Sequence, residues 1–548
     1  MVGTAARFEA FKVTVVLSVL VAFFVAGPAA GGDFDGDGFT DLAVGVPFEM
    51  VSGEPFAGAI NAIYGGSTGL SVGGNQFFNQ DSDGIDGAAE DGDRFGLALA
   101  VGDFDGDGFF DLAVGVPSED VGTVLSAGAV NVIYGGSAGL SATGDQLVTQ
   151  DNCTTASTSE EFDRFGATLA AGDFNGDGYD DLAVGAPNED VGSADSAGAV
   201  VVLFGSSGGL TADGLWFAGN TTSGTSDEND TFGDALTTGD FDGDGFVDLA
   251  IGVPGDEVSG EAGAGSVILL YGGPTYPTYP ATGGIFHQDI PGVQGGSEAG
   301  DGFGAALTAG DFDRDGFDDL AVGVPGEQVG IHSGAGLINV LYGSSTGITA
   351  AGNAYFHQEN LAITLANEID DNFGETLATG DFNGDGYWDI AVGVPHEDLS
   401  LADAGMVVIL WGGFGGINGA AAYLRELDFT GTSGELGDRF GHSLAAGDFD
   451  HDGRTDLAIS TPYNDDTSGA VDVGAVYVGY GVATGVNPIH GLNVADGVVF
   501  SQCTGITGGC DSQDGFGYAL ASYPGSDAYV FASGFEPGNT IEWDTSLP

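Results

Sequence analysis

The stretch Asp33–Asp41, which reads DFDGDGFTD, places aspartates at positions 1, 3, 5 and 9 of nine residues. When the chain turns tightly, oxygen atoms at positions 1, 3 and 5 can converge on one point, and the glycine at position 6 permits that turn. A carbonyl at position 7 and the aspartate at position 9 would complete an oxygen cage. Such ligation suits Ca²⁺ better than Mg²⁺, which keeps more of its water. The stretch therefore predicts a calcium-binding loop.

The pattern D-x-[DN]-x-D-G-x-x-D occurs seven times, at intervals of 67 to 71 residues, which is typical of a repeat architecture. We therefore predict up to seven bound Ca²⁺, one for each loop. The last loop is the weakest candidate, because His451 and Arg454 lie within it. The predicted ligands are Asp33, Asp35, Asp37, Phe39, Asp41, Asp103, Asp105, Asp107, Phe109, Asp111, Asp173, Asn175, Asp177, Tyr179, Asp181, Asp240, Asp242, Asp244, Phe246, Asp248, Asp311, Asp313, Asp315, Phe317, Asp319, Asp381, Asn383, Asp385, Tyr387, Asp389, Asp448, Asp450, Asp452, Arg454 and Asp456.

Two other interpretations of these loops exist. An EF-hand needs glutamate at position 12, but that position holds only valine or isoleucine here, as at Val44 and Ile251. A β-strand has already begun at that point, so each loop should join two strands rather than two helices. The second alternative is a set of polar hairpins without metal, in which the clustered carboxylates would repel one another.

Each repeat contains four segments with strand composition. In the second unit they are RFGLALAVG, DLAVGVP, AGAVNVIYGG and the shorter QLVTQD, all rich in branched or aromatic residues and bounded by glycine or proline. No segment shows a sustained helical period. Four-stranded units that repeat around an axis form propeller blades. The fold class predicted is all-β, a seven-bladed β-propeller of four-stranded antiparallel blades.

The ends of the chain break the repeat in complementary ways. Six Phe-Gly pairs each lie eight residues before an acidic loop, but the first loop has no such partner. A seventh pair begins at Phe516, where Pro524 stands in place of the expected aspartate. A closed ring explains both observations if the strand Phe516–Ala521 completes the blade that begins at Asp33. Closure would leave no open sheet edge.

The two ends also suggest how the chain is processed. Arg7 and Lys12 precede the apolar run Val13–Gly27, which is short for a membrane span, and small residues follow it. We predict a secretion signal over residues 1–30, the propeller over 31–522 and a tail of unknown role over 523–548. An uncleaved N-terminal anchor is the alternative for the first segment. The mature chain would carry no transmembrane span.

Charge and cysteine content narrow the possible partners and the compartment. The formal net charge is −73, and no lysine follows Lys12. Nucleic acid and anionic membranes are therefore poor partners. Cys503 and Cys510 lie close enough for a local disulfide in an exported protein, whereas Cys153 is left over.

The repeated sequence, RFG followed by GDFDGDG and DLAVGVP, resembles the FG-GAP repeat of integrin α-subunit propellers and their bacterial relatives. The resemblance covers residues 33 to about 522. It implies a seven-bladed propeller with calcium in the hairpins between the first two strands of each blade. It also implies adhesion or ligand binding at the cell surface or outside the cell, with an extracellular protein or glycan as partner. No inserted ligand-binding domain, leg domain or membrane span accompanies the propeller.

Motifs that suggest catalysis are explained better by the repeat. G-x-S-x-G occurs at Gly65, Gly135, Gly205 and Gly343, but always at the same place in the unit and before a strand, so we interpret it as a turn. We therefore predict a binding module with no catalytic residues. The alternatives are a calcium-dependent propeller lyase or hydrolase that acts on polysaccharide, and a structural surface-layer component. A His, Tyr or Arg cluster at one mouth of the ring would favour the enzyme, and an acidic mouth would favour binding.

Overall fold

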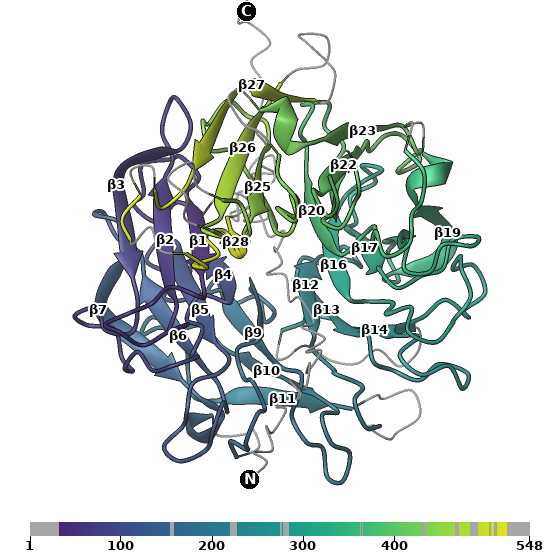
Figure 1. Cartoon of the computed structure of the whole chain (residues 1–548). Helices are drawn as coiled ribbons and strands as arrows, with labels where there is room; N and C mark the ends of the chain where they lie inside the picture. Colours follow the sequence, from purple (N-terminus) through teal and green to yellow (C-terminus); the bar gives the residue numbers. More distant parts are fainter. Residues whose placement is uncertain are drawn as a thin grey trace, which may run out of the picture.

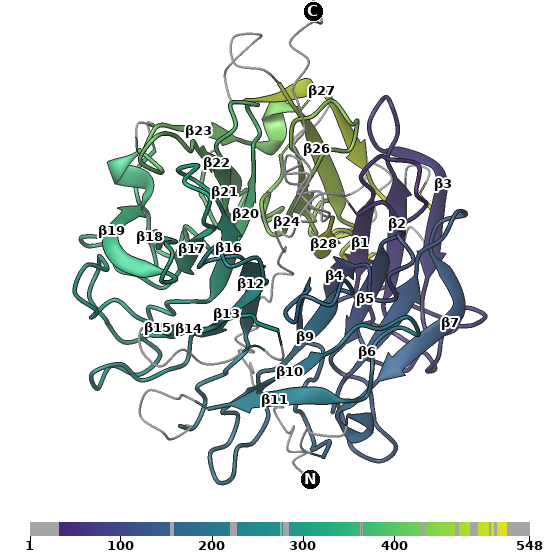
Figure 2. The same ribbon diagram turned by 180° about the vertical axis from the view of Figure 1, so that it is seen from behind.

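The computed structural model describes residues 32–522, except 154–157, 220–226, 275–276, 278–283, 362, 364, 400, 430–433, 466–470, 483–490, 504–505 and 509–511. Seven four-stranded antiparallel sheets stand around a common axis, as Figures 1 and 2 show from opposite sides. The predicted seven-bladed, all-β propeller is confirmed. Within the described residues, no helix is long and apolar enough to span a membrane.

Each blade runs from an inner strand beside the axis to an outer strand at the rim. The inner strands of neighbouring blades contact one another around the whole ring. From inside to outside the blades are β28 (Ala519–Ala521), β1 (Leu42–Val46), β2 (Ala59–Tyr64), β3 (Ser71–Phe78); β4 (Ala98–Gly102), β5 (Asp111–Val116), β6 (Ala129–Tyr134), β7 (Ser141–Val148); β8 (Thr168–Gly172), β9 (Asp181–Ala186), β10 (Ala199–Leu203), β11 (Gly214–Ala218); β12 (Ala235–Gly239), β13 (Asp248–Val253), β14 (Ser266–Leu270), β15 (Ile285–Phe286); β16 (Ala306–Gly310), β17 (Asp319–Val324), β18 (Leu337–Tyr342), β19 (Thr349–Phe356); β20 (Thr376–Gly380), β21 (Asp389–Val394), β22 (Met406–Leu410), β23 (Ala421–Leu424); and β24 (Leu444–Gly447), β25 (Asp456–Thr461), β26 (Ala475–Gly481), β27 (Leu492–Phe500).

The second strand of each blade is apolar on both faces because neighbouring blades cover both faces. Every residue of β5 is buried. Its glycine, Gly115, is required for close packing, since a Cβ there would lie 2.1 Å from the carbonyl oxygen of Gly166 in the next blade. The Phe-Gly pair of one blade therefore packs against the glycine of the DLAVGVP strand in the blade before it.

The outer strand is longer than the sequence suggested. β3 and β7 each have eight residues, because they begin directly after the G-x-S-x-G segment. That segment is a tight turn, in which the amide of Gly69 donates to the carbonyl of Gly66 at 2.7 Å. The hydroxyl of Tyr64 accepts a hydrogen bond from the amide of Leu140, at the corresponding turn of the next blade. The motif therefore joins blades, in agreement with its interpretation as a turn.

Closure of the ring occurs in the blade predicted. β28 pairs antiparallel with β1, with Ala43 opposite Ala521 and Gly45 opposite Ala519. In Figure 1 the yellow β28 lies beside the purple β1. The regular strand begins at Ala519 rather than Phe516, but Phe516 is fully buried. Its amide also donates to the carbonyl of Val473, in the neighbouring blade.

A set of buried glutamates also links the blades. The glutamates of the PSED, PNED and PHED loops accept hydrogen bonds from glutamines 39 residues earlier, as in Gln80 to Glu119 at 2.6 Å. The same bond closes the ring, where Gln502 donates to Glu49 at 3.0 Å. Glu397 is 3% exposed and accepts its hydrogen bond from Gln358.

The remaining sequence predictions concern the cysteines and the two ends. Cys503 is disulfide-bonded, and Cys153 is free and buried. Cys510, the signal over residues 1–30 and the tail over 523–548 lie outside the described residues.

Ring closure predicts a sharp difference between two truncations. Ending the chain before Phe516 removes β28 and exposes β1 as a sheet edge. Burial of Phe516 and Leu520 alone is worth about 3–6 kcal/mol, so we expect aggregation or a much lower unfolding temperature. Ending it after Ser522 should change the melt little. Equal melts for the two truncated chains, followed by circular dichroism, would contradict the closure.

The buried glutamates that link the blades predict a dependence of stability on pH. Burial, followed by the charge of Asp371, raises the pKa of Glu397 to about 8 from its ordinary 4.5. Its contribution to stability is therefore complete below pH 4.5 and is lost as the pH rises through 8. Glu397→Gln should reduce the fall in unfolding temperature between pH 5 and pH 9 in saturating calcium. Exposed Glu54→Gln is the control, and an identical fall in both variants would refute the assignment.

Candidate metal centres

The seven acidic loops lie on one face of the ring and are hydrogen-bonded to one another. Six of them connect an inner strand to the second strand of its blade, and the loop at Asp33 precedes β1, the second strand of the first blade. The amide of the residue at position 8 donates to the position-1 carbonyl of the preceding loop, as in Phe110 to Asp33 at 3.2 Å. Thr40 to Asp448, at 3.4 Å, completes the circle. The loops therefore form one closed belt, and each loop supports its neighbour.

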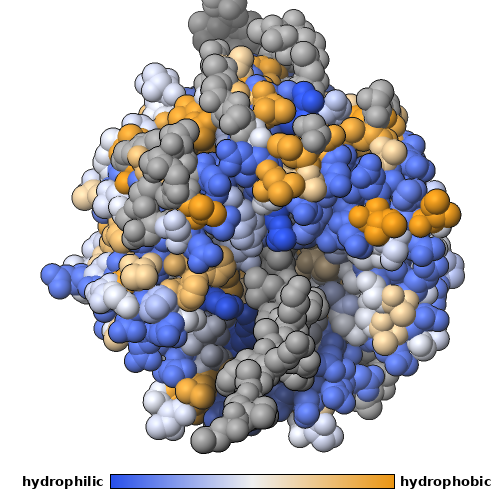
Figure 3. All heavy atoms as spheres, in the orientation of Figure 1, coloured by the Kyte–Doolittle hydropathy of each residue, from blue (hydrophilic) through white to orange (hydrophobic). Residues whose placement is uncertain are grey.

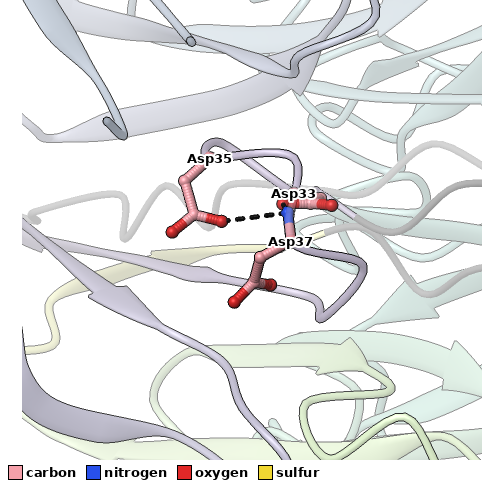
Figure 4. A group of neighbouring side chains, drawn as sticks. All are labelled: Asp33, Asp35 and Asp37. Carbon is pink, nitrogen blue, oxygen red and sulfur yellow. Dashed lines mark hydrogen bonds between the residues drawn. The ribbon is translucent and has the colours of Figure 1, made fainter. Parts of the chain in front are cut away.

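Within a loop, the first aspartate organises the turn. Both carboxylate oxygens of Asp33 accept backbone amides, from Gly36 at 2.6 Å and from Gly38 at 2.7 Å. Figure 4 shows Asp33, Asp35 and Asp37 on the bent loop, with the amide of Asp37 donating to Asp35 at 3.1 Å. One oxygen from each of these three carboxylates lies within 4.8 Å of the others. The predicted convergence of positions 1, 3 and 5 is present here.

Other loops bring together overlapping sets of the predicted ligands. Positions 1, 3 and 5 also converge at Asp311, whereas positions 1, 3 and 9 converge in the loops at Asp103, Asp240 and Asp448. The loops at Asp173 and Asp381 carry asparagine at position 3, so their carboxylates stand at positions 1, 5 and 9. In the latter, the amide nitrogen of Asn383 donates to Asp389 at 3.1 Å.

The aspartate at position 9 has a second role that the sequence did not reveal. Asp41 is 1% exposed, and its two oxygens accept the amides of Phe34 and Gly65, both at 2.8 Å. Burial raises its pKa to about 8, although these two hydrogen bonds lower it. A carboxylate with such a desolvation cost needs positive charge nearby to stay ionised at neutral pH.

The side chain at position 7 packs between loops. A Cβ on Gly36 would lie 2.5 Å from the ring of Phe109 in the next loop, which explains the glycine at position 4. In the last loop the residue at position 7 is Arg454, which instead forms an ion pair with Asp452 at 2.6 Å. That pair competes for a predicted ligand, in line with the weakness expected of this site. The carbonyl ligands predicted at position 7 remain predictions.

The donor set of the loops fits a hard cation. Asp313 Oδ1 and Asn383 Oδ1 are buried and have no hydrogen-bond partner among the described residues. Both belong to position 3, whose oxygen is predicted to bind metal. Unsatisfied buried oxygens cost free energy unless something pairs with them, and the carboxylate, amide and carbonyl donors present are those that Ca²⁺ prefers.

The opposite face of the ring carries a different cluster. Arg94, Arg164 and Arg439 each precede the Phe-Gly pair of an inner strand, at the end away from the acidic loops. His442 directly follows the pair after Arg439, and Tyr518 follows the pair that begins at Phe516. Recognising this cluster requires aligning the residues that flank each Phe-Gly pair around the closed ring. On the face drawn in Figure 3, hydrophilic side chains surround scattered hydrophobic ones.

Strands, closure and acidic loops together define a repeat propeller with one acidic loop in each blade. A family model described as FG-GAP repeat matches residues 24–60, 95–133, 165–203, 232–270, 303–338, 373–410 and 440–478. The chain is an FG-GAP repeat protein that resembles the integrin α-subunit propeller.

Relatives match through part of their length. Integrin alpha-PS2 of Drosophila melanogaster is 33% identical over 241 residues, which cover 42% of this chain and 15% of the integrin. Phosphatidylinositol-glycan-specific phospholipase D of Bos taurus is 37% identical over 155 residues, which cover 28% of this chain and 18% of the phospholipase. The chain thus spans under a fifth of the length of either relative.

Solved structures share the general shape only distantly. An Agrocybe aegerita lectin that recognises non-reducing terminal N-acetylglucosamine covers 89% of this chain and 95% of its own, with a TM-score of 0.48 and 13% identity. A rhamnogalacturonan lyase of Bacillus licheniformis covers 80% of this chain and 73% of its own, with a TM-score of 0.32 and 13% identity. At these scores neither likeness carries an argument about function.

The ligand assignment predicts a change in the number of bound ions. Asp105→Ala removes one converging carboxylate from the loop at Asp103, so titration calorimetry should count about one calcium fewer than in the parent protein. The control is Asp83→Ala, an exposed aspartate outside every loop, which should leave the count unchanged. Equal losses in the two variants would show that the ligands are assigned wrongly.

Proposed function

We propose that this protein is an exported, calcium-binding β-propeller that acts as an adhesion or ligand-binding module at the cell surface or outside the cell. The observation that carries the proposal is the closed belt of seven acidic loops, each hydrogen-bonded to the next. Extracellular calcium sites typically bind at 10⁻⁴–10⁻³ M. Such sites would be occupied outside cells, where calcium is abundant, and largely empty in the cytosol.

Two further observations support this location and role. The first 30 residues have the composition of a secretion signal. Integrin alpha-PS2 and the phospholipase are relatives of this chain, and the resemblance to integrin α-subunit propellers implies adhesion at the cell surface. We extend that role to this chain as a proposal, since the match covers only part of each relative.

Calcium at these loops would also stabilise the fold. At millimolar calcium, a site of 10⁻⁴–10⁻³ M affinity contributes about 0.4–1.4 kcal/mol. Seven such sites contribute about 3–10 kcal/mol, which is comparable to the whole stability of an ordinary domain. The presentation of any ligand-binding surface would then depend on calcium through the fold.

Catalysis is the second candidate function, and one observation favours it. The face opposite the metal loops carries arginine, histidine and tyrosine rather than only acids, and His396 lies 3.5 Å from Glu375 there. Against a catalytic role, His442 and Tyr518 are 1% and 2% exposed, so neither reaches a substrate without movement of the chain. Binding is therefore the better supported function.

Calcium-dependent retention on surfaces tests the proposal. We expect the labelled protein to bind immobilised extracellular glycans and cell-surface proteins in 2 mM calcium and to be released by a chelator. The melt in chelator should occur well below that in calcium, which links release to the fold. Equal retention and overlapping melts in calcium and in chelator would overturn the calcium-dependent function.

A further inference from the structure

The three arginines near the axis occupy positions that do not need arginine. The residue before each Phe-Gly pair has a positive φ, including Arg94 at 62°, Arg164 at 59° and Arg439 at 55°. At the equivalent positions of two other blades the residue is glycine, Gly302 and Gly515, which adopts this conformation without strain. A long side chain at positive φ costs free energy, so the backbone gives no reason for arginine there.

Contacts join two of these arginines to an aromatic cluster. The guanidinium carbon of Arg439 lies 4.9 Å from the ring centre of Tyr463. The ring of His442 lies 6.0 Å from Tyr463 and 4.6 Å from Tyr518. Tyr518 in turn lies 5.0 Å from the ring of Phe48.

The cluster continues from Phe48 to the next blade. The ring of Phe48 lies 5.9 Å from that of Phe56, whose carbonyl accepts the amide of Arg94 at 3.0 Å. Arg164 follows on the adjacent blade, where burial and then the charge of Arg94 lower its pKa. Arg439, Tyr518, Arg94 and Arg164 thus lie on four consecutive blades of the ring, in that order.

The guanidiniums of this arc form no ion pair. Among the described residues, none of the three donates a side-chain hydrogen bond or lies within ion-pair distance of a carboxylate, although the chain carries 81 acids. Two acids of the inner ring, Asp234 and Glu375, belong to the blades on either side of the arc, and the charge of Asp234 acts on Arg164 alone among the three. Glu375 is already engaged by His396 at 3.5 Å.

A buried histidine gives an independent sign of a ligand. His442 is 1% exposed, and both of its ring nitrogens lack a hydrogen-bond partner. It lies between Tyr463 and Tyr518, at the inner end of the same cluster. A buried imidazole with neither nitrogen satisfied is costly, and a water that bridges it to a bound ligand would pair with it without direct contact between the ligand and the ring.

We propose that this cluster binds an acidic saccharide, with sugar carboxylates on Arg94, Arg164 and Arg439. Guanidinium groups bind carboxylates through paired, charge-assisted hydrogen bonds. The three arginines belong to three different blades, and an oligosaccharide presents one carboxylate after another. The half-exposed rings of Phe48 and Tyr463 offer flat apolar surfaces between the charges, which suit sugar rings better than a peptide backbone.

The overall negative charge does not forbid such a ligand. At physiological ionic strength, charges more than about 8 Å away are largely screened, so the local guanidiniums dominate once the ligand is in place. This inference rests on the proposed function as a binding module and specifies where and what the module binds.

The test uses the full chain in constant 2 mM calcium over an immobilised polymer of alternating glucuronic acid and N-acetylglucosamine. The matched control polymer has its carboxylates reduced to alcohols. Arg94→Gly, which fits the local backbone, should weaken binding about tenfold or more through loss of a charge-assisted bond. Arg425→Gln, on the outer edge and paired with Asp428 at 2.8 Å, should leave the affinity unchanged.

The outcomes separate this inference from others. Tight binding to the reduced polymer, retained binding after glycine replaces all three arginines, or equal binding of an acidic peptide of matched charge would each overturn it. An unchanged calcium count and melt in Arg94→Gly establish that the variant folds. If surface retention fails while the polymer still binds, the proposed adhesion is wrong. If retention persists without polymer binding, only this inference fails.

Discussion

Repulsion between carboxylates packed into the loops is the constraint on which the rest of this propeller depends. Two unit charges within 4.8 Å of each other cost about 3 kcal/mol near a protein surface, and five of the described loops hold three carboxylates that close together. Backbone amides that donate to the first aspartate relieve part of it. A bound cation would relieve the remainder, and the aspartate at position 9 would then remain ionised while it holds the following turn through Gly65. Metal binding at the proposed sites would therefore be coupled to blade geometry through one side chain.

Neighbouring blades are joined by different interactions on the two faces of the ring. On one face, backbone hydrogen bonds between successive loops form a circle. On the other, glutamine donates to a buried glutamate of the next blade. Both sets cross the junction between the first and last blades. The ends of the chain are thus joined by the same interactions as any other pair of neighbouring blades, which explains why a short β28 is enough to complete the sheet.

The fold could be predicted because the same pattern of loop and strand residues occurs seven times in the sequence. Loop spacing, Phe-Gly phase and the missing partner of Asp33 together indicated seven blades and their closure. Contacts between blades could not be read in this way, since the role of Glu119 depends on a glutamine 39 residues earlier that faces it only in the folded ring. The double role of Asp41 was hidden for the same reason, because its partner Gly65 belongs to a later turn.

Positions that vary among the repeats carry the information about function. The residue before Phe-Gly is arginine in three repeats and glycine in two, so the shared positive φ does not require arginine. The three arginines add charge that forms no ion pair within the described residues. Stability therefore does not account for these residues, whereas a ligand with negative charge does. In this proposal the acidic loops on one face stabilise the ring, and the three arginines on the opposite face bind the ligand near the ring axis.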